Sequence, residues 1–373
     1  MDPIEDVRYR QSTQFRIWSY TRSKLAELRS KTNALATTHI SNRLAADLAD
    51  GQTLPDFLTA EEEERLLKFY TVELLRAAEF CALPTEIRAT AAVHLRRFYV
   101  TNSVMTYSPK DILKTCLFFG SKGEGFYTRL SKFAEKFPDT TAEEVVAGEF
   151  LLCQGIRFCF DVRHPFRALE GVVLELRRLY PDESQRSRID RVHAQTRHIL
   201  KFSPLITDAY FHYTPSQIMF AAFLMVDREL AQQFIQRSFD YSLENAANAK
   251  NGTGVKPDSD AIQALQRKIV QTIESCRELL ETEPPERMDS YWDTPGARED
   301  IRPLVKKLRK CRDPDRADLV ALQKARREQA VKKERPAKKE DNDVFGPANG
   351  AQARETKRRK VSGGLEDPFG PPL

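Results

Sequence analysis

The chain has 373 residues, 41% of them hydrophobic, which is enough for two domains with sizeable cores and excludes disorder throughout. Its six cysteines are scattered, with no C-x-x-C pair and no histidines at metal-ligand spacing. We therefore expect reduced, buried thiols in an intracellular protein, and neither a metal site nor a disulfide scaffold. No apolar run has the length of a membrane span or the character of a signal peptide, so we expect a soluble protein.

The net charge of +5 is divided unevenly along the chain. Residues 301–373 carry 20 Lys and Arg against 11 Asp and Glu, whereas residues 1–300 carry 39 against 43. The globular part is therefore mildly acidic, and the basic character belongs to the C-terminal part. A nucleic-acid-binding core would show the opposite distribution, so we expect no direct contact with nucleic acid.

The first elements that the sequence predicts are helices. The segment QFRIWSYTRSKLAELRSK, residues 14–31, is amphipathic. Thr59-Ala-Glu-Glu62 has the spacing of a capping box, in which the hydroxyl caps one free amide and the glutamate reaches back to another. Pro84 then opens a second amphipathic stretch. Helices are therefore expected after Thr59 and after Pro84.

One helix opening occurs twice in the chain. Residues 107–122 read YSPKDILKTCLFFGSK, and residues 213–228 read YTPSQIMFAAFLMVDR. In both segments a hydroxyl residue precedes a proline, which is a favoured helix start because the missing N–H of proline needs no partner in the first turn. Self-similarity at such a long period indicates a duplicated structural unit.

A further helix is expected between the two copies. Thr140 or Thr141 stands ahead of Glu143 and Glu144 in the pattern of a capped first turn. The apolar spacing that follows predicts that this helix runs to about Ile156.

No series of alternating, β-branched segments predicts strands, so the fold class is all-α. We divide the chain into an N-terminal helical extension (1–54), a first unit of some five helices (55–160), a second such unit (161–285), a C-terminal helical extension (286–334) and a disordered basic tail (335–373).

The tail contains one short basic cluster, formed by Lys357, Arg358, Arg359 and Lys360. Such a cluster is a candidate nuclear import signal. The alternative interpretation is a tail that only solvates the protein, and composition does not decide between the two.

The most enzyme-like string is GSKGEGFY, residues 120–127. It has the spacing of a phosphate loop, but Phe126 and Tyr127 stand where Lys and Ser or Thr are required. It also follows a predicted helix instead of a strand, so we interpret it as a glycine-rich turn that ends a helix. No hydrolase, metalloprotease or kinase motif is present. We expect no catalytic residue, no metal and no cofactor.

Four segments together resemble the cyclin H family. They are RFYVTNSVMTYSPKDILKTCLFFGSK at 97–122, GEFLLCQGIRFCFDVRHPFRALEGVVLELRRLYP at 148–181, LITDAYFHYTPSQIMFAAFL at 205–224 and VKKLRKC at 305–311. The resemblance implies tandem five-helix cyclin boxes, with the repeated openings as the third helix of each box. The N-terminal segment around Trp18 and Leu25 also resembles that of cyclin H, and we interpret these two side chains as internal packing.

The resemblance also implies a kinase-binding site in the first box. Lys122 matches the family's lysine at the end of the third helix, and Glu149 matches its glutamate in the fifth. Phe150, Cys153 and Phe158 belong to the same surface, where cyclins receive the mobile C-helix of the kinase. A charged anchor beside an apolar stripe is typical of a helix-in-groove interface.

Each charged residue also has a simpler interpretation. Lys122 would be favoured at any helix C-terminus by the helix dipole, and Glu149 would be a solvated helix glutamate. The string Lys122-Gly-Glu-Gly125 departs from the family, because Gly123 lacks a side chain that could pack on a kinase.

The function implied is that of a non-catalytic cyclin subunit in the nucleus. It would activate a cyclin-dependent kinase, within TFIIH, toward the C-terminal domain of RNA polymerase II and the activation loops of other such kinases. The resemblance further implies a RING-finger assembly factor as third partner and the TFIIH core as a fourth. The alternative is a DNA-binding initiation factor of the TFIIB type, although the N-terminal zinc ribbon of that family has no counterpart before Cys81. An autonomous enzyme is a weaker alternative.

Overall fold

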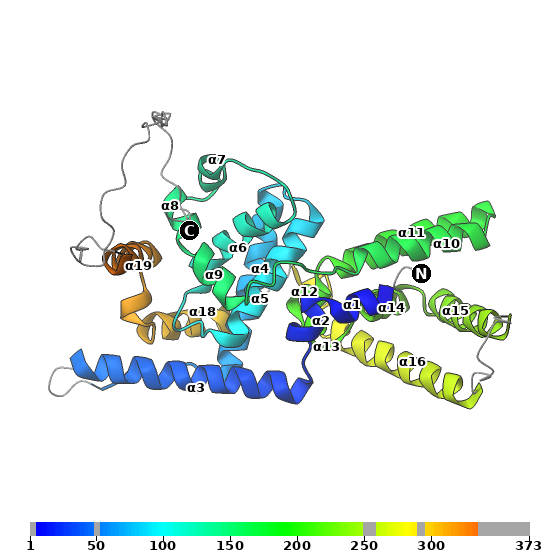
Figure 1. Ribbon diagram of the computed structural model, residues 1–373, viewed down its shortest axis with the longest axis horizontal. Helices are drawn as coiled ribbons and strands as arrows, with labels where there is room; N and C mark the ends of the chain where they lie inside the picture. The colour runs from blue at the N-terminus through cyan, green and yellow to red at the C-terminus, as the bar shows by residue number, and fades with distance from the viewer. Residues whose placement is uncertain (1–4, 48–52, 249–258, 289–294, 335–373) are drawn as a thin grey trace, which may run out of the picture. The chain divides into compact units, whose positions relative to one another are not determined.

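The computed structural model describes residues 5–47, 53–248, 259–288 and 295–334, and every regular element in these ranges is helical (Figure 1). The all-α prediction is confirmed. The chain forms two compact units, which divide between Ala317 and Asp318. In the second unit the described element is the helix α19, Leu319–Glu334. No helix among the described residues is both long and apolar enough to cross a membrane.

The first helical repeat is built around one buried helix. Its elements are α4 (Ala60–Phe80), α5 (Thr85–Thr101), α6 (Pro109–Gly123), α7 (Leu130–Ala134), α8 (Ala142–Ala147) and α9 (Glu149–Gly155). Every side chain of α5 from Ala89 to Val100 is buried, because the helix packs on α4, α6 and α9. Burial on all faces is what a helix needs to serve as the centre of a bundle.

The second repeat has a similar order. It consists of α10 (Phe166–Leu179), α11 (Glu183–Leu200), the short α12 (Ser203–Ile206) and α13 (Ala209–His212), then α14 (Pro215–Val226), α15 (Arg228–Asn248) and α16 (Ser259–Glu281). Helix α14 is the most apolar of these and packs on α10, α11, α15 and α16. The two repeated openings therefore become α6 and α14, each with proline in its first turn.

Flanking helices precede and follow the repeats. The N-terminal ones are α1 (Glu5–Gln11), α2 (Thr13–Trp18) and α3 (Arg22–Asp47). After the second repeat, α18 (Pro295–Lys310) packs on α4, and the 3₁₀ turn η1 (Pro314–Arg316) follows it. The backbone N–H of Asp313 donates to Met105 O at 2.9 Å, which fixes the end of the first compact unit to the first repeat.

The predicted helix starts are largely confirmed. Thr59 and Thr141 each form a capping box, with Glu62 and Glu144. Thr214 does so as well, with Gln217. Ser108 also occupies the cap position, but its hydroxyl makes no capping hydrogen bond.

The helix predicted from Thr140 or Thr141 to about Ile156 is interrupted, and this prediction is corrected. Helix α8 ends at Ala147, Gly148 follows, and α9 begins at Glu149. A Cβ atom at Gly148 would lie 2.8 Å from the Thr115 hydroxyl oxygen, so only glycine lets the backbone approach α6 this closely. The close approach brings Glu149 against the end of α6.

Four charged side chains join the two repeats to the N-terminal extension. Asp208, just before α13, accepts from the Arg29 guanidinium at 2.7 and 2.9 Å and from Arg96 Nη2 at 2.7 Å. Glu64 of α4 pairs with the same two arginines at 2.9 and 3.1 Å. We call this set the inter-repeat ion cluster. It connects α3, α4 and α5 with the second repeat.

Candidate functional site

The string GSKGEGFY ends helix α6, as the sequence predicted. The N–H of Phe126 donates to Ser121 O at 2.8 Å, and the N–H of Gly125 donates to Lys122 O at 3.1 Å. Gly125 has a φ of +72°, the left-handed conformation that this kind of helix ending requires. The pattern is a Schellman motif, and it places Lys122 in the last turn of the helix.

Glu124 in the same turn is an exposed residue, but its side chain contacts α5. Its carboxylate accepts from the Thr90 hydroxyl at 2.6 Å, and Thr90 is buried on α5. The Thr90 oxygen also lies 2.8 Å from His164 Nε2, in the segment between the repeats. The turn is therefore held by side-chain contacts in spite of its two glycines.

Lys122 and Glu149 form an ion pair. Their Nζ and Oε1 atoms are 2.6 Å apart, and the Glu149 side chain is only 3% exposed, whereas Lys122 is 33% exposed. Burial raises the pKa of Glu149, and the Lys122 ammonium partly offsets that rise. Glu149 is thus not a solvated helix glutamate, and the structure brings the two predicted anchors together.

An aromatic series continues from the ion pair. The Lys122 ammonium lies 5.7 Å from the ring centre of Phe119, which is 5.4 Å from that of Phe160. Phe160 in turn lies 6.3 Å from Phe158, which is 57% exposed. The predicted residues Lys122 and Phe158 are therefore connected through Phe119 and Phe160, two residues that the sequence analysis did not select.

The remaining predicted residues lie on α9. Cys153 is half-buried, and its carbonyl oxygen accepts from the N–H of Phe158 at 2.8 Å, so the chain folds back over the end of the helix. Phe150 is exposed to solvent. Tyr127 and Phe126, just after α6, are also exposed and were not predicted as site residues. Exposed aromatic side chains on two neighbouring helix ends are typical of a protein–protein interface.

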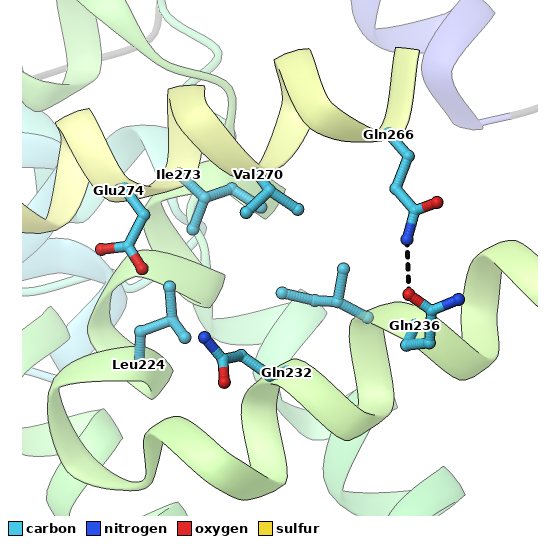
Figure 2. Close-up of a pocket in the computed structure, with 8 residues that line it drawn as sticks. Leu224, Gln232, Gln236, Gln266, Val270, Ile273 and Glu274 are labelled. Atoms are coloured by element: carbon cyan, nitrogen blue, oxygen red, sulfur yellow. Dashed lines mark hydrogen bonds between the residues drawn. The ribbon is translucent and has the colours of Figure 1, made fainter. Parts of the chain in front are cut away.

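Two cavities lie elsewhere, at the second repeat. The larger, about 1130 Å³, is lined mainly by the inter-repeat segment and helices α10, α11, α14, α15 and α16, and also by Tyr9 of α1 and Glu86 of α5. The smaller, about 140 Å³, lies between α14, α15 and α16, where Gln266 donates to Gln236 at 2.6 Å (Figure 2). Its carboxylate, Glu274, pairs with Arg228 and Arg277, as expected of a structural ion pair.

The described residues contain no candidate metal site, and they do not include the candidate import signal. In the described part of the chain, no three His, Cys, Asp or Glu side chains form a group that could hold a metal ion. The candidate import residues Lys357, Arg358, Arg359 and Lys360 lie outside the described residues, as does the predicted tail.

Comparisons with known proteins show what the chain is similar to. The model of the Cyclin C-terminal domain matches residues 164–281. Cyclin mcs2 of Schizosaccharomyces pombe is 34% identical over 235 residues, which make up 61% of this chain and 72% of that one. Cyclin CCL1 of Saccharomyces cerevisiae is 31% identical over 247 residues, 63% of this chain and 62% of the relative, so the chain spans slightly less than two thirds of it.

Two solved structures contain chains that are similar to this one. A chain of the CAK complex from Chaetomium thermophilum bound to ATP-γ-S is 46% identical with a TM-score of 0.78, over 92% of this chain and all of that chain. A chain of the yeast TFIIK (Kin28/Ccl1/Tfb3) complex is 27% identical with a TM-score of 0.57, over 73% of this chain and all of that chain. Two helical repeats, in which the repeated openings form α6 and α14, together with these similarities show that the chain belongs to the cyclin family, in its cyclin H branch.

Proposed function

We propose that this chain is a regulatory subunit that binds and activates a cyclin-dependent kinase, and that it has no catalytic activity of its own. Cyclin H-type relatives support this function. The observation that carries the site is the Lys122–Glu149 ion pair beside an exposed aromatic series. The proposed kinase-binding surface consists of Lys122, Glu149, Phe150, Cys153 and Phe158.

The chemistry of this surface suits the helix of a kinase. Phe150 and Phe158 are about half exposed and offer apolar area that a partner can bury. Lys122 keeps a third of its side chain accessible, so its ammonium can also bind a backbone carbonyl at the end of the arriving helix. Holding that helix inward lets the kinase form its own Lys–Glu pair, which aligns the phosphates of ATP.

The relatives support a proposal for the wider assembly. One similar structure is a complex of Kin28, Ccl1 and Tfb3, and another is a CAK complex. By analogy, we propose that the chain assembles with a cyclin-dependent kinase and a RING-finger assembly factor on the TFIIH core, in the nucleus. The substrates would be the C-terminal domain of RNA polymerase II and the activation loops of other cyclin-dependent kinases.

The test is a binding titration against the kinase of the same species. Phe158→Ser should weaken binding at least tenfold, because it removes an exposed aromatic from the centre of the surface. Phe80→Ser is the matched control, since Phe80 is 72% exposed at the end of α4 and belongs to no predicted site. Equal affinity of the two variants would contradict the site, and absence of binding by the unaltered chain would contradict the function.

A further inference from the structure

Helix α9 ends in a second Schellman motif, and the residue in the glycine position is an arginine. The N–H of Phe158 donates to Cys153 O at 2.8 Å, and the N–H of Arg157 donates to Gln154 O at 2.9 Å. Arg157 has a φ of +55° and Phe158 a φ of +54°. Side chains other than glycine disfavour this conformation, because Cβ crowds the following carbonyl oxygen. Something must hold the turn in place.

The Arg157 side chain has a specific partner. Its guanidinium lies 5.4 Å from the ring centre of Trp18, the last residue of α2, and the buried guanidinium of Arg97 lies 5.3 Å from the same ring. Trp is the best aromatic partner for a cation–π contact, and Arg is the cation most often found in one. Glycine in place of Arg157 would relieve the backbone and remove this contact.

Trp18 is itself rigidly held. It is fully buried, and its ring packs against Tyr20 and against Phe211 of the second repeat. On the same helix, the Gln14 amide pairs with the backbone of Arg163, whose N–H donates to Gln14 Oε1 at 2.7 Å. Helix α2 is therefore fixed to the segment between the repeats, and the buried Trp18 ring gives Arg157 a well-packed surface to contact.

We propose that Arg157 and Trp18 are positioning residues for kinase binding: their contact holds the turn after α9 so that Phe158 faces outward. Phe158 is more than half exposed, and its outward ring completes the series that leads back to Lys122. The role of Phe158 in binding rests on the function proposed above. The contact between Arg157 and Trp18, which we call the clamp, is a property of the free chain and can be measured without any kinase.

The chain contains a matched control for backbone strain. Helix α4 ends in the same motif, with Ala82 at a φ of +54° and the N–H of Leu83 donating to Ala78 O at 3.0 Å. Ala82 has no side chain that could reach a partner, so Ala82→Gly changes only the strain. Its effect on the melting temperature, a rise of about 2 °C, measures what glycine contributes at such a position.

Three variants of Arg157 separate the strain from the clamp. Arg157→Ala keeps the strain and loses the contact with Trp18, so Tm should fall by about 1–2 °C. Arg157→Gly loses both, so Tm should exceed that of the alanine variant by about the 2 °C seen for Ala82→Gly. Arg157→Lys retains a cation and should recover part of the binding that the other two lose.

Two readouts decide the matter in the full chain. Hydrogen exchange of the Phe158 amide in the free chain should accelerate at least fivefold in Arg157→Gly, because the contact with Trp18 is lost while the fold remains. If the turn then holds its outward conformation about a tenth of the time, kinase affinity falls about tenfold. Ala82→Gly should leave both unchanged.

Unchanged exchange and unchanged kinase affinity in Arg157→Gly would overturn the proposal. Faster exchange with full affinity would overturn the positioning role and leave only a structural clamp. If the unaltered chain binds no kinase, the proposed function fails, and the exchange experiment still judges the clamp by itself.

Discussion

The inter-repeat ion cluster gives the sharpest stability prediction. Asp208→Asn replaces the carboxylate on which Arg29 and Arg96 converge with a neutral amide of the same shape. Arg96 is 3% exposed, so its charge cannot be compensated by water. Removing one partner of a buried ion pair costs about 3–5 kcal/mol, because the other charge is left without compensation. Here Glu64 still faces both arginines, which favours the lower end, about 3 kcal/mol.

The assay is thermal unfolding of the full chain and the variant at neutral pH. At about 2 °C per kcal/mol for a chain of this size, Tm should fall by about 6 °C. The control is Asp190→Asn, which breaks an ion pair of similar length, 2.6 Å to Arg177, between side chains that are 59% and 46% exposed. Exposed pairs contribute about 0–1 kcal/mol, so this variant should melt within about 2 °C of the unaltered chain.

The same cluster predicts a dependence on pH. Burial opposes the ionisation of Asp208, but Arg96 and Arg29 outweigh burial and hold the pKa of Asp208 below its ordinary value. A carboxylate with a lowered folded pKa stabilises the fold above its unfolded pKa, about 3.9, and the contribution is lost as the pH falls through the folded pKa. The Tm difference between the chain and Asp208→Asn should therefore be constant from pH 8 to about 5 and shrink below about pH 4.

Two results would refute this reasoning. A Tm difference of Asp208→Asn no larger than that of Asp190→Asn would show that burial adds nothing to the pair. A difference that grows as the pH falls below 4 would have the wrong sign for a carboxylate whose ionised form is stabilised by folding.

Four further changes have expected outcomes. Gly123→Ala should raise the free energy of unfolding by about 0.5 kcal/mol, because its Cβ would meet open space within a helix. Gly125→Ala should lower it by about 1 kcal/mol, because the residue has a φ of +72°. Chemical denaturation measures both changes. Gly155→Ala should destabilise by at least about 2 kcal/mol in the same assay, since its Cβ would lie 2.3 Å from the Phe98 ring. Removing residues 335–373 should leave kinase affinity unchanged and reduce nuclear accumulation, so a truncated chain that still reaches the nucleus would dispose of the import signal.

Local signals predicted much of the fold. The capping box at Thr59 and the proline-led openings at 109 and 215 are short-range patterns, and each became a helix start. The break at Gly148 could not be read in the same way, because it depends on the close approach of Thr115 from another helix. Contacts between distant segments decide where a locally acceptable helix must end.

The candidate site, like the fold, was predicted only in part. Lys122 and Glu149 were predicted from a resemblance, and only the folded chain shows that they pair with each other and that Glu149 is buried. The left-handed conformation of Arg157 had no sequence signal, because glycine or asparagine is the usual residue there. Its partner Trp18 was correctly interpreted as internal packing, but its contact with Arg157 joins residues that are far apart in sequence.

The most direct test of the central claim is a phosphorylation assay with the purified kinase and a peptide of polymerase II C-terminal repeats. We expect the kinase alone to be nearly inactive, the full chain to raise its turnover by orders of magnitude, and Phe158→Ser to shift the concentration needed for half activation upward at least tenfold. Phe80→Ser should activate like the unaltered chain. A kinase whose turnover does not change when the chain is added would contradict the function, and equal half-activation by Phe158→Ser would contradict the surface.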